Sequence, residues 1–274
     1  LLAAVVGLML AGGAAFLIEY LDDSVRDQRD VTDLLGLPML GVVGALGEGQ
    51  QLPTVLAENE PRSPLAEAFR MVRTNLSYAL PAQEGARRYL VTSAGPTEGK
   101  TTVTANLATV MAQAGQRVIL VDADLRRPTL YKAFGVPSKP GLTSYLAGMV
   151  ASVDDILIDT EMDGVRMLSC GPLPPNAAEL LNSARMEQLL DELDDRCDVV
   201  LLDSPPLLAV ADAAILACMV SGVILVLEAG TTRLEGAAAA IDVLNKAGAK
   251  VLGAVLNNVK LRRRGYGSDY YYYY

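Results

Sequence analysis

A loop rich in glycine and threonine carries the residues best suited to chemistry. It reads SAGPTEGKTT over residues 93–102 and matches the phosphate-binding loop (P-loop) form, except that Ala94 replaces the first glycine. In this form, backbone N–H groups at the start of the next helix face phosphates, Lys100 reaches the β- and γ-phosphates, and Thr101 offers a hydroxyl to Mg²⁺. We therefore predict that the loop binds Mg·ATP. Its candidate nucleotide-binding residues are Gly95, Pro96, Thr97, Glu98, Gly99, Lys100, Thr101 and Thr102.

Two acidic motifs follow apolar runs further along the chain. Asp122 and Asp124 stand two residues apart after one run, and Asp203 opens the sequence DSPP after another. In extended chain the first two carboxylates point the same way, and their repulsion calls for a shared cation or proton. We expect Thr101, Asp124 and Asp203 to hold Mg²⁺, and one carboxylate of the pair to accept a proton from an attacking hydroxyl. The alternatives are a solvated acidic loop for the pair and a turn-opening residue for Asp203.

Short apolar strands alternate with longer helical stretches from residue 88 onward, and these elements must position the motifs. The predicted strands are 89–92, 117–121, 165–168, 199–202, 223–227 and 251–256, and the predicted helices include 101–113, 178–193 and 234–247. Consecutive apolar residues are typical of strands buried on both faces of a parallel sheet. The pattern predicts an α/β fold, a doubly wound and mostly parallel sheet of the P-loop NTPase class. Ligands bind outside the carboxyl ends of such strands, which is where the motifs stand.

Composition narrows the chemistry further. The formal net charge of −9 argues against a nucleic-acid-binding protein, so no nucleic-acid partner is expected. Histidine is absent from the 274 residues, which excludes zinc–histidine sites and Ser–His or Cys–His catalysis. The three cysteines are far apart and indicate core residues in a reducing compartment. The chemistry must therefore use carboxylates, lysine, arginine, hydroxyls and a bound metal.

The first 18 residues are uncharged and apolar, about the minimum length for crossing a bilayer. We predict a transmembrane helix over residues 1–20, with the remainder on the cytoplasmic side of the cell membrane, where ATP is found. The alternative is a buried helix of a soluble domain. Because the chain starts with leucine rather than methionine, we expect it to be a piece of a longer protein. A connector is predicted over 21–62, with a short helix at 30–35 and a short strand at 39–43.

Taken together, these motifs resemble those of the bacterial tyrosine autokinases of the polysaccharide co-polymerase type. That family has a P-loop, a second motif Asp-x-Asp-x-Arg and a Walker B motif Asp-x-Pro-Pro. Here these are Lys100-Thr101, Asp122-Ala123-Asp124-Leu125-Arg126 and Asp203-Ser204-Pro205-Pro206. The resemblance covers essentially the whole chain and implies a protein-tyrosine kinase domain over 63–260. Residues 1–20 would then be the end of a chain-length regulator module.

The same resemblance implies partners and residue roles. The partners would be the polysaccharide chain-length regulator and the capsule or exopolysaccharide export machinery, with a tyrosine phosphatase reversing the reaction. Asp122 would accept the tyrosine hydroxyl proton, Arg126 would stabilise charge or bind the acceptor, and Asn257 would contact adenine. Ala94 and Thr97 stand where relatives have glycine, which requires φ values open to other residues.

A charged stripe and a tyrosine-rich tail complete the resemblance. Glu67, Arg70 and Arg73 recur every three residues on a helix that Ser63 and Pro64 should begin. In the family such a stripe mediates ring-like self-association, whereas an exposed salt-bridged helix is the plain alternative. The tail, residues 261–274, should be disordered and would be phosphorylated by a neighbouring subunit. Its acceptor residues are Tyr266, Tyr270, Tyr271, Tyr272, Tyr273 and Tyr274.

Two other functions remain open from the sequence. Cell-division and plasmid-partition ATPases share the fold, but they carry an extra lysine five residues before the P-loop lysine, where this chain has Gly95. A switch of that type would use ATP hydrolysis to drive dimerisation. A catalytically dead scaffold is disfavoured, because Lys100, Thr101 and the three aspartates are all present.

Overall fold

One eight-stranded sheet organises the computed structural model, which describes residues 2–20, 22–45, 62–80 and 85–260. The strand order is β1-β8-β7-β2-β6-β3-β5-β4, and all neighbours are parallel except β4 and β5. The strands are β1 Met39–Gly44, β2 Arg87–Ser93, β3 Val118–Asp122, β4 Leu157–Asp159, β5 Val165–Leu168, β6 Val199–Asp203, β7 Gly222–Glu228 and β8 Val251–Val259. The predicted α/β class and mostly parallel sheet are thereby confirmed.

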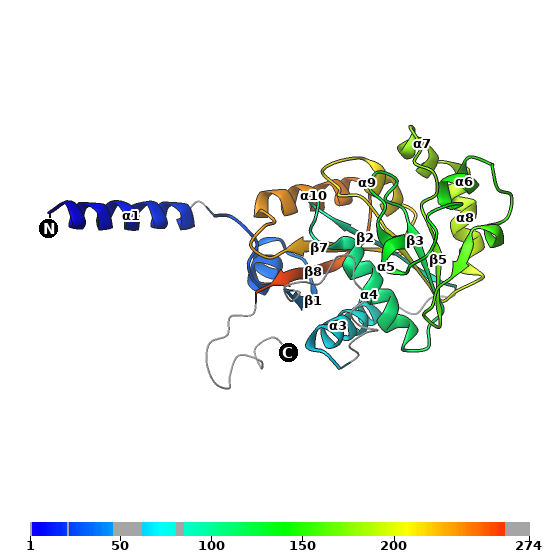
Figure 1. The fold of residues 1–274 in the computed structure, drawn as a ribbon, viewed down its shortest axis with the longest axis horizontal. Helices are drawn as coiled ribbons and strands as arrows, with labels where there is room; N and C mark the ends of the chain where they lie inside the picture. The colour runs from blue at the N-terminus through cyan, green and yellow to red at the C-terminus, as the bar shows by residue number, and fades with distance from the viewer. Residues whose placement is uncertain (1, 21, 46–61, 81–84, 261–274) are drawn as a thin grey trace.

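Helices cover both faces of this sheet (Figure 1). The helix α1, Leu2–Tyr20, extends away from the sheet in Figure 1. The other helices are α3 Pro64–Ala79, α4 Lys100–Ala112, α5 Leu130–Ala133, α6 Leu142–Leu146, α7 Ala177–Leu181, α8 Ala184–Asp194, α9 Asp212–Ala217 and α10 Leu234–Lys246, with a π-helical turn η1 Asp30–Leu34 and a 3₁₀ turn η2 Val153–Asp155. The predicted helix over 178–193 is in fact two helices, α7 and α8, because Asn182 and Ser183 separate them.

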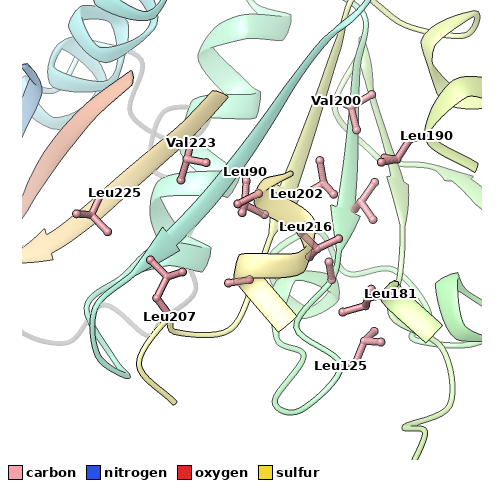
Figure 2. Packing of buried hydrophobic residues seen from close by; sticks show 14 of the residues in the cluster. Leu90, Leu125, Leu181, Leu190, Val200, Leu202, Leu207, Leu216, Val223 and Leu225 are labelled. Atoms are coloured by element: carbon pink, nitrogen blue, oxygen red, sulfur yellow. The ribbon is translucent and has the colours of Figure 1, made fainter. Parts of the chain in front are cut away.

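Each face of the sheet has its own apolar core. Side chains of α3 and α4, such as Phe69 and Leu107, pack against one face. Side chains of α8, α9 and α10 pack against the other, and Figure 2 shows Leu216 of α9 among the leucines of the strands. Because both faces are buried, the central strands are apolar at consecutive positions, as the sequence indicated.

The helix that carries the charged stripe begins where the sequence predicted. Ser63 accepts a hydrogen bond on its hydroxyl from the backbone N–H of Ala66 at 3.1 Å, and Pro64 occupies the first helical position. Phe69, Val72 and Leu76 are buried on one side of α3. The cap and the apolar stripe together fix both the start of α3 and its packing against α4 and β1.

The helix expected to cross a membrane forms over Leu2–Tyr20. Among the described residues, however, no helix is both long and apolar enough to span a bilayer, so the transmembrane assignment is corrected. The described side chains of α1, including Leu8 and Phe16, are largely exposed.

The segment after α1 contains the short helix and the short strand predicted for the connector, as η1 and β1, and it packs against the sheet. Val25 is fully buried; its N–H donates to the carbonyl of Thr232 at 2.8 Å, and its carbonyl accepts from the N–H of Gly230 at 2.8 Å. Further along, β1 pairs in parallel with β8 at the sheet edge. Residues well before the predicted kinase boundary at 63 thus contribute to the same core.

The three cysteines differ in exposure. Cys170 and Cys197 are buried, Cys218 is exposed after α9, and all three are free thiols. Burial raises the pKa of each buried thiol to about 12. The predicted tyrosine acceptors in residues 261–274 lie outside the described residues.

Candidate active site

The P-loop joins the carboxyl end of β2 to the start of α4. Gly99 has φ +91° and ends the loop, and Lys100 begins the helix with its side chain largely buried. A glycine in the left-handed region lets the chain turn sharply, so that the first N–H groups of α4 point out of the helix end. This is the strand–loop–helix context that the predicted nucleotide site requires.

We expected the loop residues that replace glycine to have backbone φ values that non-glycine residues adopt easily, and Thr97 does not. Its φ is +63°, in the left-handed region that favours glycine, whereas Ala94 has no positive φ. A β-branched residue in this region is strained, because its side chain crowds the backbone. The loop therefore tolerates Thr97 at an energetic cost, which the sequence analysis did not foresee.

Glu98 lies beneath the loop rather than facing the nucleotide side. Its side chain is buried, and Oε1 accepts a hydrogen bond from the hydroxyl of Thr232 at 2.7 Å. Burial raises the pKa of Glu98, and the hydrogen bonds from Thr232 and from the Gly95 backbone oppose that shift. A carboxylate would also repel a triphosphate, so only the backbone of Glu98 is suited to bind one.

Asn257, at the end of β8, also contacts the loop. Its Nδ2 donates to the carbonyl of Glu98 at 3.0 Å, and a Cβ added to Gly99 would come within 2.0 Å of the same nitrogen. The described contact of Asn257 is therefore with the loop backbone, and the expected contact with adenine stays a prediction.

Asp203 ends β6 directly behind the start of α4. Its Oδ2 accepts from the hydroxyl of Thr101 at 2.6 Å and its Oδ1 from Thr104 at 3.3 Å. Burial raises the pKa of Asp203 to about 6, while the Thr101 hydrogen bond and the Lys100 charge oppose the shift. The structure thus brings Asp203 beside Lys100 and Thr101, which lie about a hundred positions earlier in the sequence.

Asp122 stands beside Asp203 on the adjacent strand, as the register of β3 and β6 dictates. Its carboxylate is fully buried; Oδ2 accepts from the N–H of Leu130 at 3.2 Å, and Oδ1 has no hydrogen-bond partner. Burial, then the nearby charges of Asp203 and Asp124, raise the pKa of Asp122 well above its ordinary value. A buried carboxylate with one unpaired oxygen at a strand end is suited to accept a proton.

Asp124 is turned towards its own loop. Its Oδ1 accepts from the backbone N–H groups of Arg126 at 3.1 Å and Arg127 at 2.9 Å. No described hydrogen bond joins Asp124 to Thr101 or Asp203. Of the three predicted metal ligands, Thr101 and Asp203 are hydrogen-bonded to each other, and the nearby charge of Asp124 helps to raise the pKa of Asp203. The role of Asp124 as a metal ligand stays a prediction.

The Thr101 hydroxyl and the Asp203 carboxylate fit a hard cation. No group of three or more His, Cys, Asp or Glu side chains able to hold a metal occurs in the described part of the chain. Mg²⁺ does not require one, since it keeps several waters and binds one or two carboxylates together with substrate phosphates. Thr101 and Asp203 supply oxygen donors of that kind, and the unpaired Oδ1 of Asp122 remains available to accept a proton.

Arg126 makes a contact that the sequence analysis missed. Its Nε and Nη2 donate to the two carboxylate oxygens of Asp212 at 3.0 and 3.1 Å. Asp212 is fully buried at the first position of α9, and this bidentate pair raises the pKa of Arg126. The pair joins residues 86 positions apart, so no local spacing could have identified Asp212. Thr129 was missed for the same reason; its hydroxyl lies 3.4 Å from that of Thr101.

The charged residues of the stripe on α3 have ion-pair or hydrogen-bond partners within the same chain. Arg70 and Glu67 form a salt bridge at 2.7 Å, and Arg73 Nη1 donates to the carbonyl of Val110 near the end of α4 at 2.6 Å. Glu67 remains exposed. These contacts match the plain alternative of a salt-bridged helix, and they leave the role in self-association a prediction.

Comparison with known proteins agrees with this geometry. A family model described as an AAA domain matches residues 95–255. The tyrosine-protein kinase YwqD of Bacillus subtilis is 42% identical over 219 residues, which are 80% of this chain and 90% of that protein. The solved kinase domain of the Escherichia coli tyrosine kinase ETK has a TM-score of 0.81 at 32% identity and covers 91% of this chain and 100% of that domain.

The rival class is less similar. The septum site-determining protein MinD of Pyrococcus horikoshii, solved with Mg-ADP, has a TM-score of 0.55 at 28% identity and covers 63% of this chain and 70% of that one. The partition-type alternative therefore accounts for the fold but not for the extent of the match. With its P-loop, its paired aspartates and its likeness along most of its length, the chain belongs to the bacterial tyrosine-protein kinases.

Proposed function

We propose that this kinase transfers the γ-phosphate of Mg·ATP to tyrosines in the C-terminal tail of a neighbouring copy. The observation that carries the proposal is the pairing of Asp122 with Asp203 at the carboxyl ends of β3 and β6, behind the P-loop. Two buried carboxylates, one hydrogen-bonded to Thr101 and one with an unpaired oxygen, can divide the work of cation binding and proton acceptance.

The reaction assigns each residue a task. The tyrosine oxygen bonds to the γ-phosphorus, the bond from that phosphorus to the β–γ bridging oxygen breaks, ADP leaves, and the tyrosine proton passes to Asp122 Oδ1. Lys100 and the loop amides hold the phosphates throughout. Thr101, Asp124 and Asp203 would hold Mg²⁺, which when bound neutralises charge on the phosphates. A tyrosine hydroxyl has a pKa near ~10, so a base with a raised pKa assists its ionisation at neutral pH.

Transfer between copies can be tested by mixing two variants. Lys100→Met retains its tail but should lose phosphate binding, and a tail-deleted chain should keep its active site. We expect the tail of the Lys100→Met chain to gain phosphate only when the tail-deleted chain and Mg·ATP are present, as intact-mass steps on its C-terminal peptide. A tail that stays unmodified in the mixture, while wild-type protein phosphorylates itself, would contradict transfer between copies.

Self-association would bring each tail to a neighbour's site. We propose that the stripe of Glu67, Arg70 and Arg73 takes part in a ring, with Glu67 exposed for an interchain partner. Tail phosphorylation adds roughly −1.5 to −2 charges per tyrosine, and this repulsion would dissociate the ring. The cycle, reversed by a tyrosine phosphatase, would regulate export or polymerisation of capsular or exopolysaccharide together with the chain-length regulator.

A location at the cytoplasmic face of the cell membrane fits the exposed apolar side chains of α1. Such a surface binds lipid or a membrane-embedded partner more favourably than water. The proposal predicts that the full chain co-floats with lipid vesicles while a chain lacking residues 1–20 does not. Equal recovery of the two chains in the vesicle fraction would exclude α1 as the anchor.

A further inference from the structure

Thr232, in the loop between β7 and α10, reaches under the P-loop. Its side chain is buried, and its hydroxyl donates to Glu98 Oε1 at 2.7 Å. The same hydroxyl accepts from the backbone N–H of Glu228 at 2.8 Å. Because a hydroxyl has one proton and the Glu228 N–H occupies a lone pair, that proton is committed to Glu98.

Glu98 is held from three sides. Its carboxylate takes the Thr232 hydroxyl and a hydrogen bond from the Gly95 backbone, and its own carbonyl accepts from Asn257 Nδ2. Its Oε2 has no hydrogen-bond partner. Glu98, in the middle of the loop, thus has hydrogen bonds to the start of the loop, to β8 and to the segment after β7. Leaving a buried carboxylate oxygen unpaired is costly, so loss of one more partner should shift the loop.

We propose that Thr232 is a positioning residue for nucleotide binding: through the Glu98 carboxylate it fixes the direction of the loop N–H groups that receive the phosphates. Thr232 touches no reacting atom. It stands 132 positions beyond Lys100 in sequence and outside the P-loop and the two aspartate motifs. The inference rests on the P-loop being the nucleotide site, which the test below measures directly and without phosphate transfer.

The test uses Thr232→Val, which keeps the shape of the side chain and removes the hydroxyl, and Thr232→Ser, which keeps the hydroxyl. The full chain is titrated with Mg·ADP in a calorimeter, and the kinetic constants for ATP and for a tyrosine peptide are measured. We expect Thr232→Val to weaken Mg·ADP binding and raise the KM for ATP by about tenfold, the size of a lost charge-assisted hydrogen bond. Thr232→Ser should stay within about twofold of wild type, and the peptide KM should not change in either variant.

A matched control removes a buried hydroxyl elsewhere. Thr109 in α4 is fully buried, and its hydroxyl donates to the carbonyl of Ala105 at 2.9 Å, away from the loop. Thr109→Val should lower the melting temperature slightly and leave Mg·ADP binding unchanged. If Thr232→Val binds Mg·ADP as tightly as Thr109→Val does, the positioning role is wrong.

A double variant separates positioning from general damage. If Thr232 acts through Glu98, adding Thr232→Val to Glu98→Ala should weaken Mg·ADP binding no further than Glu98→Ala alone. Additive losses would show that Thr232 affects binding by some other route and would overturn the proposal. Loss of tail phosphorylation with normal Mg·ADP binding would instead count against the proposed transfer reaction.

Discussion

Asp203 ends its strand completely shielded from water, so its charge has a thermodynamic cost. Burial raises its pKa from 3.8 to about 6. A carboxyl whose pKa is raised by folding stabilises the fold below its unfolded pKa, and that contribution is lost as the pH rises through the folded value. In the protein without nucleotide, Asp203 should therefore lower the free energy of unfolding above pH 6.

Replacing Asp203 with asparagine should raise stability at pH 8 and leave it nearly unchanged near pH 4. The gain is at most about 3 kcal/mol, from 1.36 kcal/mol per unit of pKa. Thermal unfolding at the two pH values measures it, and kinase activity should be lost. Asp198→Asn serves as a control in which stability at pH 8 should change in the opposite direction and fall. The reason is that the Arg117 side chain holds the pKa of Asp198 below its ordinary value. Equal melting temperatures for Asp203→Asn and wild type at pH 8 would contradict the expectation.

Thr97 stores strain at the other end of the site. Its φ of +63° costs an ordinary residue roughly 1–2 kcal/mol, and glycine would remove this cost while losing ~0.5–1 kcal/mol through its greater freedom when unfolded. Thr97→Gly should therefore stabilise the protein by about 0.5–1 kcal/mol in urea unfolding, whereas Thr97→Ala keeps the strained φ and should gain nothing. A Thr97→Gly chain no more stable than Thr97→Ala would exclude backbone strain as the cause.

At the scale of the elements, Arg73 joins α3 to α4. Its guanidinium donates to the carbonyl of Val110, where the helix C-terminus favours a positive charge. Arg73→Met keeps the aliphatic stem and should lower the free energy of unfolding by about 1 kcal/mol. Arg70→Met is the matched control, since an i,i+3 ion pair on the helix surface, such as that with Glu67, contributes only ~0.2–0.5 kcal/mol. Equal losses in denaturant titrations would mean that the α4 contact contributes no more than a surface pair.

Elements with strong local patterns were predictable, and long-range pairings were not. β5 matches its predicted range, and Ser63 begins α3 as expected, because burial on both faces and N-capping leave local signatures. The short antiparallel strand β4 has no such signature, since none of its three residues is buried. The split between α7 and α8 was missed because the apolar spacing continues across it.

In the candidate site, too, features set by local sequence were predictable and long-range contacts were not. The P-loop and the aspartates at strand ends follow from local sequence, whereas the partners of Arg126 and Glu98 depend on how distant strands meet. Asp212 and Thr232 are isolated polar residues in sequence, and only the sheet order β7-β2-β6-β3 brings their loops to one edge. The contact of Asn257 with the Glu98 carbonyl depends in the same way on where β8 lies, while its expected contact with adenine stays a prediction.

At the scale of the whole molecule, assembly and tail phosphorylation should oppose each other. Because the chain already has a net charge of −9, each added phosphate increases the repulsion between copies. We expect phosphorylated protein to show a smaller oligomer mass than phosphatase-treated protein. The difference should shrink at high salt, since screening shortens the reach of surface charges. Light scattering of both forms at low and high ionic strength measures this, and identical masses at low salt would contradict it.

The single exposed thiol has a practical consequence. At neutral pH a maleimide reagent should attach to Cys218 alone, because Cys170 and Cys197 are both buried and difficult to ionise. The unaltered chain therefore offers one attachment point for a fluorophore or spin label, between α9 and the end of α10, where the Cys218 thiol lies 3.3 Å from the carbonyl of Ala247. Two labelled copies would report the distance between neighbours without any engineered cysteine.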